Sequence, residues 1–163
     1  MADPFSDVYA AVITVLLASP SVTALVDADN IVRLDTEIEP LIDDRNVGDL
    51  PMLMLTPVPG GENNLHHTSD TAQFVRSYEL IYATDEEKLA ATYGLNALDY
   101  AVMRALYSNM PRLGCPHISW FELGEWGPLT PLDVDNQAEQ ERGWQSRMTI
   151  DIIIEVQHVD LQE

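Results

Sequence analysis

Lysine is nearly absent from this chain. Among 163 residues only Lys88 is a lysine, and 8 basic side chains stand against 27 Asp and Glu, which gives a net charge of -19 at pH 7. A surface of this sign repels phosphate at long range. The charge therefore argues against a protein that binds nucleic acid directly, and equally against one that binds anionic membranes.

The excess of carboxylates has three interpretations. A protein from a high-salt host shows the same depletion of lysine, and an acidic, well-solvated surface keeps any protein soluble. The third interpretation is functional, namely an acidic wall that DNA passes without sticking to it. The composition alone leaves all three open.

Cysteine and long apolar runs are scarce too. Cys115 is the only cysteine, which excludes an internal disulfide framework and fits a reducing cytosol. The longest apolar run, residues 8–18, is interrupted by Thr14 and follows Asp3 and Asp7. It is too short to span a bilayer and has no basic segment before it. We therefore expect neither export nor membrane targeting.

One long segment near the end alternates with period two. From Arg142 to Val159 the even positions are mostly large and apolar and the odd positions mostly polar, with Ile153 as the exception. The even set is Trp144, Met148, Ile150, Ile152, Ile154 and Val156, and the odd set includes Gln145, Arg147, Thr149, Asp151, Glu155 and Gln157. Such a strand belongs to a sheet that is covered on one face only, which favours antiparallel or mixed pairing.

Other segments supply two helices and further strands. The start Asp3-Pro-Phe-Ser-Asp7 offers N-cap candidates and a proline in the first turn. The helix predicted there is apolar nearly all round, so it should be covered on more than one side. Thr84 and Glu87 match a capping box, which predicts a second helix that runs to about Tyr107. Strands are predicted at residues 31–34, 51–56, 73–83 and 117–122.

These elements predict an α+β fold. The whole chain, residues 1–163, suits a single domain. We expect a mostly antiparallel or mixed, twisted sheet of about four to five strands, packed on one face by two helices. Long loops are expected at about 57–72 and 124–143, where turn-forming and acidic residues accumulate.

The second helix carries two apolar stripes. One consists of Ala91, Leu95, Leu98, Val102 and Ala105, and the other of Leu89, Tyr93, Tyr100 and Tyr107. Two stripes require two covering surfaces. We expect the sheet to cover one stripe and the first helix to cover the other.

No motif for catalysis or metal binding stands out. His66 and His67 are adjacent, so in an extended segment their side chains point opposite ways, and exposed loop histidines are the simpler interpretation. Cys115 and His117 are explained by a turn that enters a strand. The acidic segment around Asp133 lacks the glycine and the bidentate acidic residue of a calcium-binding loop. We therefore expect no catalytic residues, no metal and no cofactor.

Tryptophans indicate contact surfaces. Trp144 begins the closing strand on its apolar side, as part of the core or of a subunit contact. Trp126 lies in an acidic loop, where a monomer gains little from it, and loop aromatics often anchor interfaces. The candidate interface residues are His66, His67, Trp126, Trp144, Arg147, Asp151 and Glu155.

The order of these segments resembles that of the tail terminator and tail-completion proteins of long-tailed bacteriophages. The likeness rests on an N-terminal helix followed by Ser21-Val-Thr-Ala-Leu-Val26, a short Ile31-Val-Arg33 strand, Leu50-Pro51 before an apolar strand, a long loop, a strand and long helix from Tyr78 to Leu106, and a final Arg142-Gly-Trp144 strand. It covers most of the chain and depends on order and spacing, without a catalytic signature. The acidic insertion at 124–143 is longer than the pattern needs.

The resemblance implies a structural virion protein and not an enzyme. Such subunits form a ring, six-membered in our expectation, on the head-proximal end of the tail tube, where it stops tube growth and meets neck or head-tail connector proteins. The protein would be assembled in the host cytoplasm, with DNA only passing through the lumen and no membrane involved. The polar side of the closing strand, with Arg147, Asp151 and Glu155, would line the channel or a subunit seam.

Two alternatives stay open at this level. A neck or head-tail connector subunit of similar size belongs to the same class of virion protein. A small acidic enzyme or ligand-binding module belongs to another class, and it would need a concave pocket with convergent polar groups. Assembly separates the two classes, because an enzyme needs no large ring.

Overall fold

The computed structural model describes residues 3–33, 51–58, 66–67, 70–85, 95–110, 112–131 and 143–157. Its helices are α1 (Pro4–Ala18), α2 (Pro20–Thr23), the short 3-10 helix η1 (Ala28–Asn30) and α4 (Leu95–Tyr107). Its strands are β1 (Ile31–Arg33), β2 (Met52–Pro57), β3 (His66–His67), β4 (Thr71–Asp85), β5 (Ile118–Leu123), β6 (Thr130–Pro131) and β7 (Gly143–Gln157).

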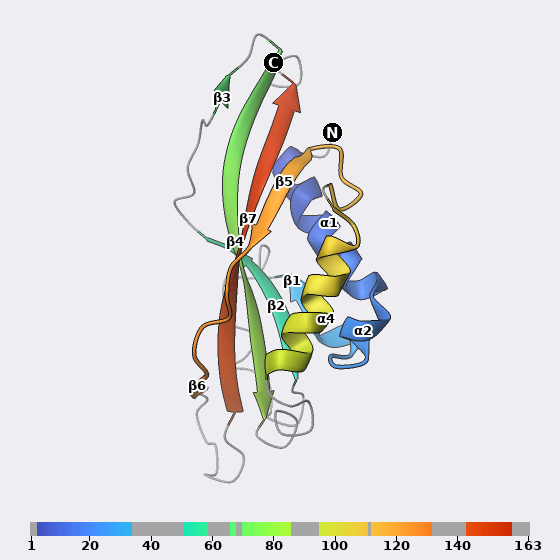
Figure 1. Ribbon diagram of the computed structural model, residues 1–163, viewed down its shortest axis with the longest axis vertical. Coiled ribbons are helices and arrows are strands. Elements are labelled where there is room, and N and C mark those ends of the chain that lie inside the picture. The colour runs from blue at the N-terminus through green and yellow to red at the C-terminus, as the bar shows by residue number, and fades with distance from the viewer. Residues whose placement is uncertain are drawn as a thin grey trace.

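The strands form one mixed sheet with the order β1-β2-β4-β7-β5, and the short strands β3 and β6 pair with β4 and β7. β1 and β2 are parallel, and the other pairs are antiparallel. β4 and β7 pair along their whole length, from Thr71 opposite Gln157 to Asp85 opposite Gly143. At about 3.4 Å per residue each spans about 50 Å. Figure 1 shows both strands running along the long axis of the molecule.

The helices lie on one face of this sheet (Figure 1). α1 contacts β1, β7, α2 and α4. Even-numbered residues of β4 and β7 face this layer, and they include the buried Tyr78, Leu80 and Tyr82 and the buried even positions from Met148 to Val156. The predictions of an α+β fold, of a helix layer on one face and of alternating burial along the closing strand are confirmed.

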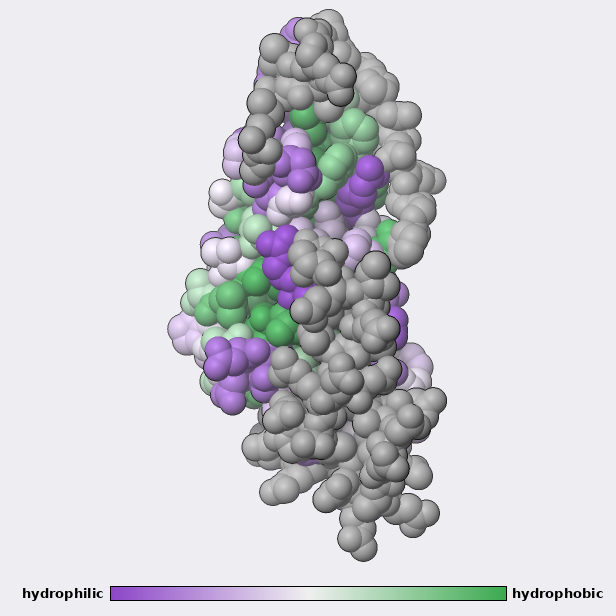
Figure 2. Space-filling view, turned by 180° about the vertical axis from the view of Figure 1, so that it is seen from behind, coloured by the Kyte–Doolittle hydropathy of each residue, from purple (hydrophilic) through white to green (hydrophobic). Residues whose placement is uncertain are grey.

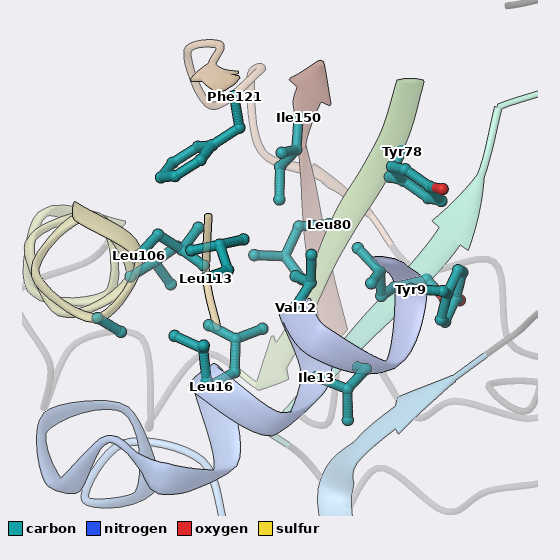
Figure 3. Packing of buried hydrophobic residues seen from close by; sticks show 14 of the residues in the cluster. Tyr9, Val12, Ile13, Leu16, Tyr78, Leu80, Leu106, Leu113, Phe121 and Ile150 are labelled. Atoms are coloured by element: carbon teal, nitrogen blue, oxygen red, sulfur yellow. The ribbon is translucent and has the colours of Figure 1, made fainter. Parts of the chain in front are cut away.

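The core lies between the helix layer and the sheet. Figure 3 shows side chains from both meeting there, among them Val12, Leu16, Leu80, Leu106, Phe121 and Ile150. Tyr9 ties α1 to the sheet, because its buried hydroxyl donates to the carbonyl oxygen of Leu55. The Tyr9 ring also meets the Tyr78 ring edge-on at 5.5 Å and lies under the Arg33 guanidinium at 4.7 Å. A tyrosine suits this position, because its ring packs against another ring while its hydroxyl reaches a backbone acceptor.

The start of α1 follows the sequence prediction. Asp3 is the N-cap, its carboxylate accepts the Ser6 amide at 2.8 Å, and Pro4 stands in the first turn. Hydrogen bonds from the side chain and the backbone amide of Ser6 hold the pKa of Asp3 below its ordinary value, because they favour the charged carboxylate. The helix ends at Ser19, whose extended backbone breaks it and whose hydroxyl accepts from the Val22 amide to begin α2.

One prediction for the second helix is wrong. Thr84 is not a helix cap, since it lies in β4 opposite Trp144 and is fully buried. Pairing with β7 outweighs the local capping signal there, because it satisfies the backbone groups of a strand that continues to Asp85. Glu87 and the predicted first turns lie outside the described residues, and α4 is described from Leu95 onward.

The predicted strands agree with the observed ones to within two residues at each end. The predicted loop at 57–72 includes β3 and the start of β4, and its other residues lie largely outside the described part. The first part of the predicted loop at 124–143 is tied to β7, because the Gly124 and Gly127 amides donate to the Thr149 and Arg147 carbonyl oxygens at 2.8 Å. Its later residues, with those around Asp133, are outside the described part.

Candidate functional site

α4 exposes large apolar side chains. Tyr100 is 68% exposed, and Met103 and Tyr107 are each 41% exposed. Spacings of three and four place them in one line on the outer side of the helix, which we call the α4 outer stripe. The opposite side of α4, with Leu98 and Val102, is the buried one. The expectation that both apolar stripes of this helix are covered within the domain is therefore wrong for the stripe with Tyr100 and Tyr107.

Two arginines lie on or just after α4. Arg104 is on the outer side of the helix and Arg112 follows its end, and both are exposed. Neither forms an ion pair with a described residue. The ion pair found among the described residues joins Arg147 to Glu79. They are two of only 8 basic residues in the whole chain, and in the described part of α4 Arg104 is balanced by Asp99. An exposed arginine without an ion pair favours contact with a carboxylate.

A groove runs beside the α4 outer stripe, between α4 and the segment that follows β5. Its volume is about 490 Å3. Met103 and Tyr107 line one side, Leu123 and Trp126 line the other, and Asp99 adds a carboxylate. An apolar lining with an acidic group suits a ligand that is apolar or cationic.

Trp126 has a structural role within the subunit. Its indole Nε1 donates to the Asp99 carboxylate at 3.1 Å, and its half-buried ring packs against the core. The interpretation that a monomer gains little from Trp126 is therefore wrong. Sequence reasoning missed this contact because α4 and the segment after β5 are brought together only by the fold. A role for Trp126 at an interface stays a prediction.

The polar side of β7 carries the three charged residues that the sequence singled out. Each is bonded to a side chain of β4, and the pairs are Arg147 with Glu79 at 3.1 Å, Ser77 with Asp151 at 2.6 Å and Gln73 with Glu155 at 3.1 Å. They lie on the face of the sheet away from the helices, which we call the back face. The exposed ion pair of Arg147 with Glu79 is worth less than about 1 kcal/mol. Together the three contacts order a polar surface.

An apolar strip crosses this polar back face. Ile153 of β7 lies opposite Val75 of β4 on one side and opposite Trp120 of β5 on the other. Directly opposed residues share a face, so the three form a row, which we call the back-face strip. Trp120 is 45% exposed, and Val75 and Ile153 are half-buried. The one residue that breaks the alternation of β7 is thus the centre of this strip.

Sequence reasoning missed Trp120 because of a β-bulge. The register between β5 and β7 shifts at Ser119, so that Ile118 and Phe121 are both buried while Trp120 points outward. Simple alternation would place Ile118 and Trp120 on the same side. The available signal was Ile153, since an apolar residue in a polar row indicates apolar neighbours on the adjoining strands.

The remaining candidates are His66, His67 and Trp144. His66 and His67 form β3 and pair with Gln73 and Ala72 of β4. Trp144 is half-buried on the helix-facing side of β7, and its Nε1 is buried with no hydrogen-bond acceptor among the described residues. The structure therefore joins the three charged residues of β7 on the back face and leaves both candidate tryptophans elsewhere.

A further apolar area lies on the side of α1. Figure 2 views the molecule from behind and shows hydrophobic side chains at mid-height, over α1 and β1, next to hydrophilic ones. On α1 itself Leu17 is 40% exposed. The first helix, although apolar nearly all round, is thus covered by the domain on its inner sides, and part of its outer side is open.

Two other classes of site, a membrane span and a metal centre, are not found in the described part of the chain. None of its helices combines the length and apolarity needed to cross a membrane. Within the same ranges, no three His, Cys, Asp or Glu side chains come together as a set of metal ligands. Cys115 is a buried thiol in the turn that leads into β5, as the sequence predicted.

No family model matches the sequence, and no curated protein matches it.

Proposed function

We propose that this protein is a structural virion subunit, the tail terminator of a long-tailed bacteriophage, which forms a six-membered ring on the head-proximal end of the tail tube. The observation that carries the proposal is the α4 outer stripe. Tyr100, Met103 and Tyr107 expose between 41% and 68% of their surface on a chain of net charge -19. Contiguous apolar side chains on so polar a surface are best explained by a face that is covered on assembly.

A second apolar surface on the same subunit supports a ring. The α4 outer stripe belongs to the helix layer, and the back-face strip belongs to the opposite side of the sheet. Two different surfaces on one subunit make a head-to-tail contact, which closes into a ring when the rotation between subunits allows it. A single self-complementary surface would instead favour a two-fold dimer.

The charge of the chain supports passage of DNA through such a ring. The chain as a whole repels phosphate, because its 27 acidic residues far outnumber its 8 basic ones. DNA would therefore cross the lumen without sequence-specific binding. The tail tube protein and a neck or head-tail connector protein would be the partners at the two ends of the ring, at the head-tail junction of the virion.

Mass by light scattering after size exclusion tests the proposal, in ordinary buffer and in molar salt. We expect a closed oligomer close to six times 18.2 kDa. Salt should favour it, because screening reduces repulsion between subunits this acidic. Binding of these rings to one end of tail tubes, seen by electron microscopy, distinguishes a terminator from a connector subunit. A chain that stays monomeric in both buffers contradicts the proposal.

The groove beside the α4 outer stripe favours a second candidate, a ligand-binding module. Its volume of about 490 Å3 and its lining by Leu123, Trp126 and Asp99 suit a small aromatic amine. A thermal-shift screen of such amines on the monomer tests this candidate. A saturable rise in Tm would support it, and the absence of any shift from a protein that forms rings would argue against it.

A further inference from the structure

The two apolar surfaces complement each other in charge. Arg104 lies on the outer side of α4 beside the stripe, exposed and without an ion pair to a described residue. The back-face strip is bordered by Glu122 of β5 and Asp151 of β7, which lie opposite each other in the next row of the sheet. Both carboxylates are exposed. Apolar groups on one surface thus match apolar groups on the other, and a cation matches anions.

We propose that neighbouring subunits join by packing the α4 outer stripe of one copy onto the back-face strip of the next. This inference rests on the proposed ring and names the surfaces that form it. Trp120 and Tyr100 would be its apolar anchors, and Arg104 would meet Glu122. Tryptophan, tyrosine and arginine are the residue types that most often dominate interface energies.

Charge points to a second copy of this chain as the occupant of the strip. A partner for the strip must bring apolar side chains together with a positive charge, because the strip is bordered by carboxylates. This chain has 27 acidic residues and only 8 basic ones, and α4 presents one of its exposed arginines next to three exposed apolar side chains. The required combination is therefore present on the subunit itself.

The layers of the fold allow this contact to repeat. α1 and α4 already cover one face of the sheet, and the back face is the opposite one (Figure 1). Placing the α4 of the next copy on the back face gives alternating helix and sheet layers from subunit to subunit. Each copy then uses one α4 outer stripe and one back-face strip. A row of subunits therefore keeps one free stripe at one end and one free strip at the other until the ring closes.

Reversal of one charge on each surface tests the contact. Arg104→Glu sets carboxylate against carboxylate, and Glu122→Arg sets arginine against arginine. Each single variant should raise the dissociation constant of the oligomer by about tenfold or more. The double variant restores opposite charges and should recover most of the wild-type assembly. The readout is light-scattering mass over a range of protein concentrations in ordinary buffer.

Matched variants control for net charge and for folding. Arg104→Gln and Thr14→Glu shift the net charge by the same amount, but Thr14 lies on an exposed part of α1 away from both surfaces. Arg104→Gln should weaken the oligomer and Thr14→Glu should not. Trp120→Ala tests the apolar part and should also weaken it. A circular dichroism melt of each variant confirms that the subunit is folded.

The outcomes separate the interface from the ring. An oligomer that tolerates both charge reversals overturns the interface and leaves the ring proposal standing. Single variants that fail to assemble, with no recovery in the double variant, also overturn the direct pairing of Arg104 with Glu122. A wild-type chain that stays monomeric in both buffers overturns the interface and the proposed function together.

Discussion

The indole Nε1 of Trp126 donates a hydrogen bond to the carboxylate of Asp99 at 3.1 Å. This contact joins the segment after β5 to α4 and fixes one wall of the groove beside the α4 outer stripe. The aromatic residues near α4 therefore have different roles. Trp126 serves the subunit itself, whereas Tyr100, at 68% exposed, is open to a partner.

Substitution of Trp126 tests its role within the subunit. Trp126→Phe removes the donor and keeps most of the ring, and we expect it to lower the free energy of unfolding by about 1 kcal/mol. Trp126→Ala also removes packing, and should lower it by about 2–4 kcal/mol. Urea unfolding of dilute protein, followed by circular dichroism, measures both. Trp120→Ala is the control at a more exposed tryptophan and should cost less, about 1 kcal/mol. Equal costs at the two tryptophans would refute the assignment.

Tyr78 should make stability depend on pH in the alkaline range. Burial raises the pKa of Tyr78 from 10.0 to about 12, against an opposing effect of Arg76. Since the folded pKa is the higher one, the unfolded chain releases the phenolic proton first. Stability is therefore complete below pH 10 and is lost as the pH rises toward 12. The loss is on the order of 1–3 kcal/mol.

Tyr78→Phe isolates this effect. The variant has no phenolic proton, so the difference between its unfolding free energy and that of the wild type should change across this pH range. Urea unfolding in a series of alkaline buffers measures the difference. Tyr100→Phe, at an exposed position of α4, is the control and should follow the wild type. Parallel curves for Tyr78→Phe and the wild type would show that Tyr78 does not carry this dependence.

Neighbouring isoleucines of β7 should respond differently to truncation. Ile152 is fully buried under the helix layer, whereas Ile153 is half-buried on the back face. Ile152→Ala should cost about 2–5 kcal/mol of unfolding free energy, because it leaves a cavity in the core. Ile153→Ala should cost about 1 kcal/mol, because water fills the space on the back face. Chemical unfolding of dilute protein compares them, and a larger loss at Ile153 would contradict the assignment of the faces.

Local patterns in the sequence predicted much of this fold. The start of α1 was visible because N-cap candidates and a proline at a helix start act on their own first turn. The alternation of β7 was visible because successive side chains of a strand point to opposite faces. The predicted capping box at Thr84 failed because a long-range pairing with Trp144 decided the backbone there. Local chemistry is a reliable guide only where no distant strand competes with it.

The candidate surfaces depended on long-range structure to different degrees. Arg147, Asp151 and Glu155 were placed on one face by period two alone. The back-face strip needed the register of three strands and the bulge at Ser119, which turns Trp120 outward. A shift of one residue in that register would place the Trp120 side chain on the other face, and no residue close to Trp120 in the sequence reveals the shift.

By itself the sequence determined the charge of this protein, the start of its first helix and the two sides of its closing strand. Each of these follows from residues that are neighbours in the chain. Only the tertiary structure decided that Tyr100 stays uncovered on α4, that Trp126 bonds to Asp99 and that Ile153 meets Trp120. The physical reason is that covering a side chain depends on which distant element packs against it, and this is fixed by strand register and helix packing.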